Sequence, residues 1–167
     1  MNYVDIVSQF FQGVGVTALK SDCQYEDLVW DSTVISKVDL ESKVIQTIRD
    51  ARIALLTTQA SEKITKEGFI SFALNGNARL YDSEISDQIN LIGASSAIQS
   101  GESIPFPSRD PITKVKTFDL HTSDQLNQVL NDGSRIKTQI LENLLTLKKQ
   151  INTLTSQEEI NSINLIA

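Results

Sequence analysis

The stretch at residues 140–154, ILENLLTLKKQINTL, has aliphatic side chains at alternating steps of four and three residues. They are Ile140, Leu144, Leu147, Ile151 and Leu154. Such steps place one apolar stripe along a helix, with the spacing of a heptad repeat. The spacing continues back to Leu126, although Gly133 and Lys137 interrupt the apolar stripe. We therefore predict a C-terminal helical arm with a heptad pattern.

Two uses of this stripe remain open. In the first, it folds back onto the rest of the chain and completes an intrachain core. In the second, it pairs with copies of itself or with a partner helix. Fewer than three clean heptads are present, which is shorter than a coiled coil usually requires. We keep both interpretations and take the five aliphatic residues as candidate interface residues.

Capping signals bound the helices in this region. Thr122 with Gln125, and Ser156 with Glu159, match the capping box, in which a hydroxyl and a side chain three residues later cap the helix start together. The stretch 131–134, Asn-Asp-Gly-Ser, offers a break in the long helix, with its serine as a fresh cap. We expect a long helix, either continuous or interrupted at 131–134, and then a short last helix.

The first 35 residues predict a β segment. Residues 14–19 and 25–30 are rich in β-branched and apolar side chains, and residues 3–11 suit a short helix. Trp30, the only tryptophan, ends the second of these strands. It is either a core anchor or an interface anchor, because tryptophan is enriched at the centres of protein interfaces.

The middle of the chain predicts a helix followed by a β-hairpin. Ser36 precedes apolar residues at helical steps, and this pattern holds through Thr58. The apolar run at 69–74 predicts a strand, and residues 77–81 predict its return. Between them, Asn75-Gly76 is the dipeptide that a type I′ turn requires, because both of its central residues need positive φ.

A further helix, a loop and a strand follow this hairpin. Asp82 or Ser83 caps the helix, which carries isoleucines on one face. Residues 100–112 hold all three prolines and predict a loop, because proline lacks an N–H and fixes its φ angle. Residues 114–120 alternate with period two and predict a strand with one buried face. The isoleucines of the helix are Ile85, Ile89 and Ile92.

Together these elements predict an α+β fold, with a small antiparallel sheet packed with helices and the helical arm at the C-terminal end. We predict three segments: an N-terminal β segment at 1–35, an α+β domain with the hairpin at 36–121, and the arm at 122–167. Apolar residues make up 40% of the chain, enough for a sizeable core, and aromatics only 6%, so aliphatic side chains must fill it.

Composition argues against several classes of function. The formal net charge is −6, and the 15 Lys and Arg residues are spread along the chain. They form no cluster of positive charge of the kind that binds a nucleic-acid backbone. One cysteine and one histidine are too few for the usual zinc ligand sets. No stretch approaches the ~20 apolar residues that span a bilayer, and the opening residues lack the pattern of a secretory signal. We expect no nucleic acid, metal, cofactor or membrane partner, and a soluble chain made in a cytoplasm.

The only histidine, His121, stands in no catalytic pattern. The residues after it at 122–124, Thr-Ser-Asp, resemble a helix start, whereas a catalytic triad needs groups that converge in space. The Gly-Val-Gly stretch at 13–15 lacks the third glycine and the long helix of a dinucleotide loop. We predict no catalytic residue and no cofactor-binding residue.

The order of these elements resembles that of small tail proteins of bacteriophages. Their later part is a domain of unknown function found at the C-termini of tail-fibre and tail-associated proteins. The motifs that carry the likeness are LVW at 28–30, SKVDLESK at 36–43, Gly68-Phe69, SDQI at 86–89, Phe106, Leu126, the helix at 136–151 and SQEEINSI at 156–163. The family often has tryptophan and Asp-Gly where this chain has Phe106 and Asn75-Gly76.

The resemblance implies a structural component of a phage virion, in the tail or at a tail-fibre attachment point, that acts through protein–protein contacts. Its partners would be copies of itself, other tail proteins, or both, and we expect a homo-oligomer. The alternative is a tail-fibre assembly chaperone that is made in the host cytoplasm and is not retained in the virion. A third class, a small-molecule enzyme, is supported by no particular residue.

Overall fold

The computed structural model describes most of the chain and divides it into two compact units. The described residues are Val4, Val7, 16–18, Tyr25, 28–30, 34–99 and 102–165. Unit 1 comprises residues 1–55 and 149–164, and unit 2 comprises residues 56–148 and 165–167. The two long helices, α2 (Lys37–Thr65) and α4 (Ser123–Thr153), each contribute to both units. The three segments predicted from the sequence stay a prediction.

In unit 1, two short strands pair next to a small apolar core. Strands β1 (Val16–Ala18) and β2 (Leu28–Trp30) are antiparallel, with Val16 opposite Trp30. Both lie inside the strands predicted at 14–19 and 25–30. Tyr25 is described but is not part of β2, and the remaining residues of these two ranges, like most of the predicted helix at 3–11, lie outside the described part. Buried side chains form the core, with Trp30 packed against it. They are Val7, Leu28, Ile35 and Leu40.

Helix α2 begins at the serine that the sequence predicts. The main-chain N–H of Asp39 donates to Oγ of Ser36 at 3.1 Å, and the Ser36 hydroxyl donates to the Asp39 carboxylate at 2.6 Å. These bonds satisfy a donor that a helix start leaves unpaired. The helix continues past the predicted limit at Thr58 and ends at Thr65.

Two arginines of α2 hold the C-terminal segment of unit 1. Arg49 donates to the main-chain oxygen of Leu154 at 2.6 and 3.0 Å, just after α4 ends. Arg52 donates to the main-chain oxygen of Ile163 at 2.8 Å, where helix α5 (Gln157–Ser162) ends. Both bonds satisfy carbonyls at helix ends, which have no partner within the helix. The predicted cap of α5 is also present, since the N–H of Glu159 donates to Oγ of Ser156.

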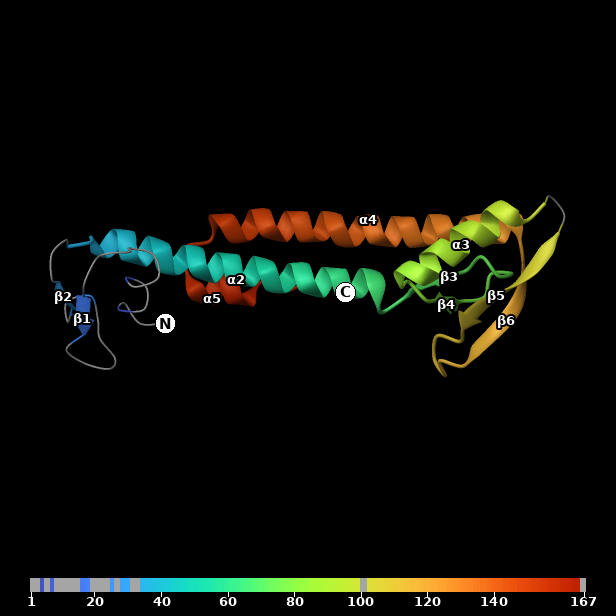
Figure 1. Ribbon diagram of the computed structural model, residues 1–167, viewed down its shortest axis with the longest axis horizontal. Helices are drawn as coiled ribbons and strands as arrows, with labels where there is room; N and C mark the ends of the chain where they lie inside the picture. Colours follow the sequence, from blue (N-terminus) through green and yellow to red (C-terminus); the bar gives the residue numbers. More distant parts are fainter. Residues whose placement is uncertain are drawn as a thin grey trace. The chain divides into compact units, whose positions relative to one another are not determined.

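Unit 2 contains a four-stranded antiparallel sheet with helices on one face (Figure 1). The strands are β3 (Phe69–Ser71), β4 (Arg79–Tyr81), β5 (Ser103–Arg109) and β6 (Lys116–Thr122), in the order β3-β4-β5-β6. Helix α3 (Ile85–Ala97) and the start of α4 cover the inner face. The predicted α+β fold with a small antiparallel sheet is therefore confirmed.

The β3–β4 connection turns at the predicted Asn75-Gly76 dipeptide. Asn75 has φ of 52° and Gly76 has φ of 76°, the left-handed conformation that a type I′ turn needs at both positions. Asparagine and glycine tolerate this conformation far better than other residues do. The predicted antiparallel pairing is confirmed, but β3 ends at Ser71 and β4 begins at Arg79, so the connection is longer than the two residues predicted.

The predicted loop at 100–112 is wrong over most of its length, because strand β5 contains Pro105 and Pro107. The N–H of Asp110 donates to the Val115 carbonyl at 3.0 Å, which fixes the pairing phase of β5 with β6. In an antiparallel pair, alternate residues point their N–H and C=O to opposite sides. The even-numbered residues of β5 therefore bond to β6. Pro105 and Pro107 are odd-numbered, so their nitrogens face away from β6 and no hydrogen bond between the two strands is lost.

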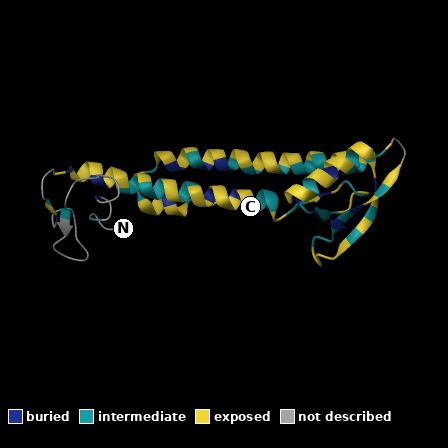
Figure 2. Cartoon of the chain, in the orientation of Figure 1, coloured by how far each residue is buried: buried dark blue, intermediate teal, exposed yellow. Residues whose placement is uncertain are grey.

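Strand β6 confirms the predicted period-two alternation, but its buried face is the polar one. Thr117, Asp119 and His121 point to the inner face, whereas Phe118 and Leu120 are 69% and 66% exposed. Figure 2 shows the alternation as exposed and less exposed bands along β6. The apolar residues of this strand therefore face away from the core.

Helix α3 also presents its isoleucines to solvent. Ile85, Ile89 and Ile92 share one face as predicted, and that face is exposed. The helix packs instead through Leu91, together with Ala94 and Ile98. The residue before its first turn is Glu84, which makes no side-chain cap, so the predicted cap at Asp82 or Ser83 is wrong.

The core of unit 2 joins the sheet to α3 and α4. Its buried members are Tyr81, Leu91, Phe106, Leu126 and Val129. Helix α4 runs without interruption through the stretch 131–134, so the alternative break there is absent. A Cβ atom on Gly133 would lie 2.8 Å from Cζ of Phe69, which is too close for a van der Waals contact. The absence of a side chain at Gly133 therefore allows the Phe69 ring to pack against α4.

Candidate functional site

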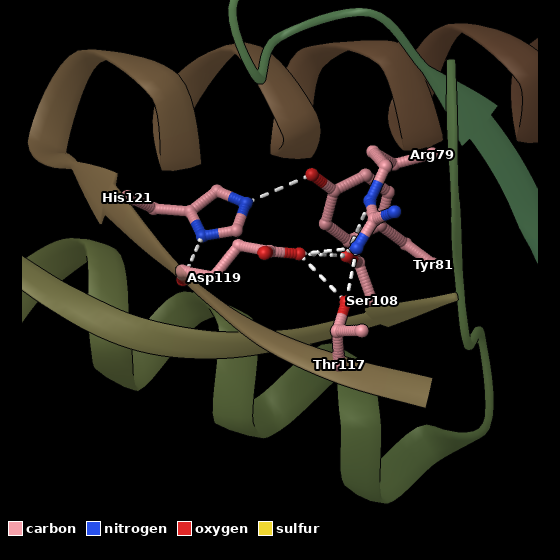
Figure 3. Close-up of polar contacts among 6 residues, drawn as sticks. All are labelled: Arg79, Tyr81, Ser108, Thr117, Asp119 and His121. Atoms are coloured by element: carbon pink, nitrogen blue, oxygen red, sulfur yellow. Dashed lines mark hydrogen bonds and ion pairs between the residues drawn. The ribbon is translucent and has the colours of Figure 1, made fainter. Parts of the chain in front are cut away.

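Six polar side chains form a connected network on the inner face of the sheet (Figure 3). Strand β4 supplies Arg79 and Tyr81, β5 supplies Ser108, and β6 supplies the other three. These are Thr117, Asp119 and His121. All six share a face because cross-strand partners and alternate residues along a strand do so.

The Asp119 carboxylate is the anionic centre of this network. It accepts hydrogen bonds from the Thr117 hydroxyl at 2.7 Å and the Ser108 hydroxyl at 3.3 Å. Arg79 forms an ion pair with the same carboxylate and also donates to Ser108 at 3.0 Å. The Thr117 hydrogen bond, together with the positive charge of Arg79, lowers the pKa of Asp119, so this group is ionised at neutral pH.

His121 is held at both ring nitrogens. Nδ1 lies 2.7 Å from the main-chain oxygen of Asp119, and Nε2 lies 2.9 Å from the hydroxyl of Tyr81. A carbonyl oxygen can only accept, so Nδ1 carries the proton and a neutral Nε2 accepts from Tyr81. Burial lowers the pKa of His121 and raises the pKa of Tyr81 to about 12. Both groups are therefore neutral at neutral pH.

The Tyr81–His121 pair is buried. His121 has no exposed surface and Tyr81 almost none. Every buried polar side-chain atom among the described residues has a hydrogen-bond partner. Ser123 and Asp124, which follow His121 in sequence, lie in the first turn of α4 and not in the network.

The described part of the chain has neither a metal-binding cluster nor a membrane-spanning helix. No three His, Cys, Asp or Glu side chains in this part of the chain gather in a way that could hold a metal ion. None of the described helices is long and apolar enough to cross a membrane.

Unit 2 also contains an apolar cleft of about 150 Å³. Its walls include Ile64 of α2, Phe69 of β3, Ile92 of α3 and Ile140 of α4. The side chains of Lys63 and Lys137 lie at the cleft, and no carboxylate from the described residues lines it. A space of this size accommodates one apolar side chain or a ring of about six carbons.

The outer face of the sheet carries apolar side chains that the fold leaves exposed. Cross-strand pairing places Ile70 beside Leu80, Pro107 beside Phe118, and Pro105 beside Leu120 on this face. Ile70, Phe118 and Leu120 are exposed, and no described element covers them. We call these six residues the outer apolar face. Arg109 and Lys116 lie on the same face between the first pair and the other two, and both form ion pairs with Asp82. Exposed apolar side chains gathered on one face favour a protein interaction site.

The predicted interface residues are mostly inside the structure. Leu144, Leu147 and Ile151 are buried in a single chain, while Ile140 and Leu154 are half-buried. Trp30 is half-buried against the core of unit 1, with its ring centroid 6.0 Å from that of Tyr25. The structure thus shows these side chains in intrachain surroundings, and their use in self-association stays a prediction.

Sequence reasoning missed both the network and the outer apolar face. The available signal was the polar series Thr117, Asp119 and His121, which alternates with Phe118 and Leu120 in one strand. The other network residues come from β4 and β5, and only the register of the sheet brings them to the same place.

Comparisons with known protein families, curated proteins and solved structures found no match to this chain. The resemblance to phage tail proteins therefore still rests on the sequence motifs alone.

Proposed function

We propose that this chain is a non-enzymatic structural component of a phage virion, in the tail or at a tail-fibre attachment point, and that it acts through protein–protein contacts. The observation that carries the proposal is the outer apolar face of the sheet. The phage setting rests on the sequence resemblance, and the contact role is supported by the exposed apolar side chains of the sheet.

The orientation of β6 supports a contact role. Folding normally buries the apolar side of an amphipathic strand, since each large apolar side chain removed from water contributes about 1.5–3 kcal/mol. Here Phe118 and Leu120 give up that contribution, while Thr117 and Asp119 occupy the inner face in a hydrogen-bonded network. A partner that covers the outer face would restore the missing apolar burial.

The inner network supports a structural role in a second way. Its only histidine is neutral, buried and bonded at both nitrogens, which leaves it no free position for a reacting group. Such a network fixes the strand register, because a slip by one residue would exchange the polar and apolar faces of β6. A rigid sheet is a suitable platform for a contact surface.

The alternative, a tail-fibre assembly chaperone, would use the same outer apolar face during assembly only. One experiment separates the two functions. Particles of the phage that encodes the chain are purified and examined for it by mass spectrometry, for the wild type and two variants. Ile70→Asp places a charge on the outer apolar face, and Ile112→Asp places one on an exposed loop residue outside that face.

The structural role predicts wild-type chain in the particle, strongly reduced incorporation of Ile70→Asp, and normal incorporation of Ile112→Asp. If the chain is absent from finished particles, and particles fail to assemble in a phage that lacks it, the chain is instead an assembly chaperone. Particles that form normally without the chain and never contain it would refute both functions. Circular dichroism of both purified variants checks that each has folded.

A further inference from the structure

The outer edge of strand β6 is open. It is the last strand in the sheet order, and its odd-numbered residues bond to β5. The main-chain groups of Lys116, Phe118 and Leu120 therefore point away from the sheet. Only Thr122 has a partner for its N–H, the side chain of Gln125 at 2.9 Å. Within the described residues, three consecutive pairing positions of β6 remain free.

The free part of β5 is protected, whereas β6 is not. Beyond its single pairing to β4 at Arg109, the side of β5 that faces away from β6 carries Pro105 and Pro107. Proline there removes the donors that another strand would need, a common way to block unwanted pairing. The β6 edge has neither proline nor bulge, although it carries the charged residues Lys116 and Asp119, and its two apolar side chains are exposed. The β6 edge can therefore accept a further strand, whereas the free part of β5 cannot.

We infer that the partner is the β6 strand of a second copy, paired antiparallel about a two-fold axis at Phe118. In this register Phe118 lies opposite Phe118 of the second copy, and Lys116 lies opposite Leu120. Each chain donates main-chain hydrogen bonds from these three residues. On the inner face, Thr117 lies opposite Asp119 of the other copy.

Charge and backbone conformation favour this register over its neighbours. An axis at Asp119 would place two carboxylates directly opposite each other, which is destabilising. An axis at Thr117 would pair Leu120 with Lys114, whose φ of 61° is incompatible with a strand. The axis at Phe118 avoids both problems and pairs two aromatic side chains, a favourable cross-strand combination.

This inference rests on the proposed contact function and specifies its first partner. Pairing at β6 would bring Phe118 and Leu120 of the two copies together in one apolar strip. A symmetric dimer of this kind uses the same patch on both subunits. This apolar strip would then be the surface that another tail protein covers.

Disulfide cross-linking tests the register directly. In a background with Cys23 replaced by serine, Phe118→Cys places two cysteines opposite each other, with Cα atoms about 5.5 Å apart. That distance suits a disulfide. In the same register the two copies of residue 120 lie about 14 Å apart along the strands, so Leu120→Cys is the matched control. A third variant, Ile112→Cys, tests random collision at an exposed loop residue.

We expect mild oxidation to give a covalent dimer of Phe118→Cys and little of the other two. Equal cross-linking of all three, or cross-linking of Leu120→Cys in preference, would overturn the register. Light scattering then tests the dimer without cross-linking. The wild-type mass should rise with concentration toward twice the 18.5 kDa of one chain.

Phe118→Pro should remain monomeric over the same concentration range, because it removes an edge N–H without removing any bond to β5. Ile112→Lys is the control and should associate like the wild type. Circular dichroism shows whether Phe118→Pro is folded. If it is not folded, Leu120→Lys is the second variant, because it keeps its N–H but places a charge at the edge. A wild-type chain that stays monomeric throughout contradicts this inference. It leaves the proposed function untouched, because particle incorporation decides that separately.

Discussion

The hydroxyl of Tyr81 lies 2.9 Å from Nε2 of His121, and this hydrogen bond joins β4 to β6 on the inner face of the sheet. The two strands are not neighbours, since β5 lies between them. Both side chains are buried, so the bond is shielded from water. His121 can accept it only while Nε2 is unprotonated, and this makes the stability of the sheet dependent on pH.

The first prediction concerns that dependence. Burial lowers the pKa of His121 below its value in the unfolded chain, so the unfolded state binds a proton more readily. The contribution of His121 to the free energy of unfolding is constant above about pH 6.5, the usual pKa of histidine. This contribution decreases as the pH falls below that value. Urea unfolding midpoints at a series of pH values should show this loss as the pH falls below about 6.5.

His121→Gln is the variant that checks the assignment. The chain has a single histidine, so the variant should lose most of the pH dependence in this window, whatever its overall stability. An unchanged pH dependence would show that another group is responsible. Tyr81→Phe should lower the free energy of unfolding by about 1–3 kcal/mol at neutral pH, because it leaves a buried acceptor unpaired.

The second prediction concerns the Asp119 carboxylate. Asp119→Asn removes the negative charge opposite Arg79, whose side chain is only 16% exposed. We expect the free energy of unfolding to fall by about 1–3 kcal/mol. This loss is smaller than that for a fully buried pair, because Asp119 itself is partly exposed. Glu102→Gln, an exposed carboxylate change outside the network, should have little effect. Equal effects of the two substitutions in urea unfolding would argue against a special role for Asp119.

Most of the fold could be predicted because its signals are local. Apolar steps of three and four, the Ser36 cap and the Asn75-Gly76 turn each act within a few residues, and each appears in the structure. The strand through Pro105 and Pro107 was missed because proline is harmful only where its N–H is needed. That need depends on the register with β6, which no local signal contains.

The candidate sites depended even more on long-range pairing. Arg79 and Asp119 are 40 positions apart and meet only because β4, β5 and β6 are assembled in one order. The alternation in β6 predicted two faces, but apolar residues are normally assigned to the inner one. The outer position of Phe118 is explained by the bonds of Asp119 on the inner face, and two of its partners, Arg79 and Ser108, lie on other strands.

The third prediction uses a pair of helix glycines. Gly133→Ala should destabilise the chain, because the new Cβ would lie 2.8 Å from Cζ of Phe69. Gly93→Ala should stabilise it by about 0.5–1 kcal/mol, since alanine is the better helix former and nothing lies within 4 Å of the new atom. Thermal unfolding of both variants checks the opposite signs. Stabilisation by both would mean that the Phe69 ring moves aside freely.

The fourth prediction concerns the heptad stripe and decides between its two uses. Leu144 is 7% exposed and the adjacent Leu145 is 54% exposed, so the two leucines form a matched pair. Leu144→Ala should lower the free energy of unfolding by about 2–5 kcal/mol, the range for truncating a buried leucine. Leu145→Ala should change it by no more than about 0.5 kcal/mol. Urea unfolding of both variants provides the measurement.

Protein concentration separates an intrachain stripe from a seam between copies. If Leu144 packs within one chain, its substitution costs the same at low and high protein concentration. If the stripe pairs with another copy, the cost grows with concentration, because association stabilises the wild type more than the variant. Comparing each variant with the wild type at the same concentration cancels any contribution from pairing at β6. We expect a concentration-independent cost, since a single chain already buries Leu144 and Leu147.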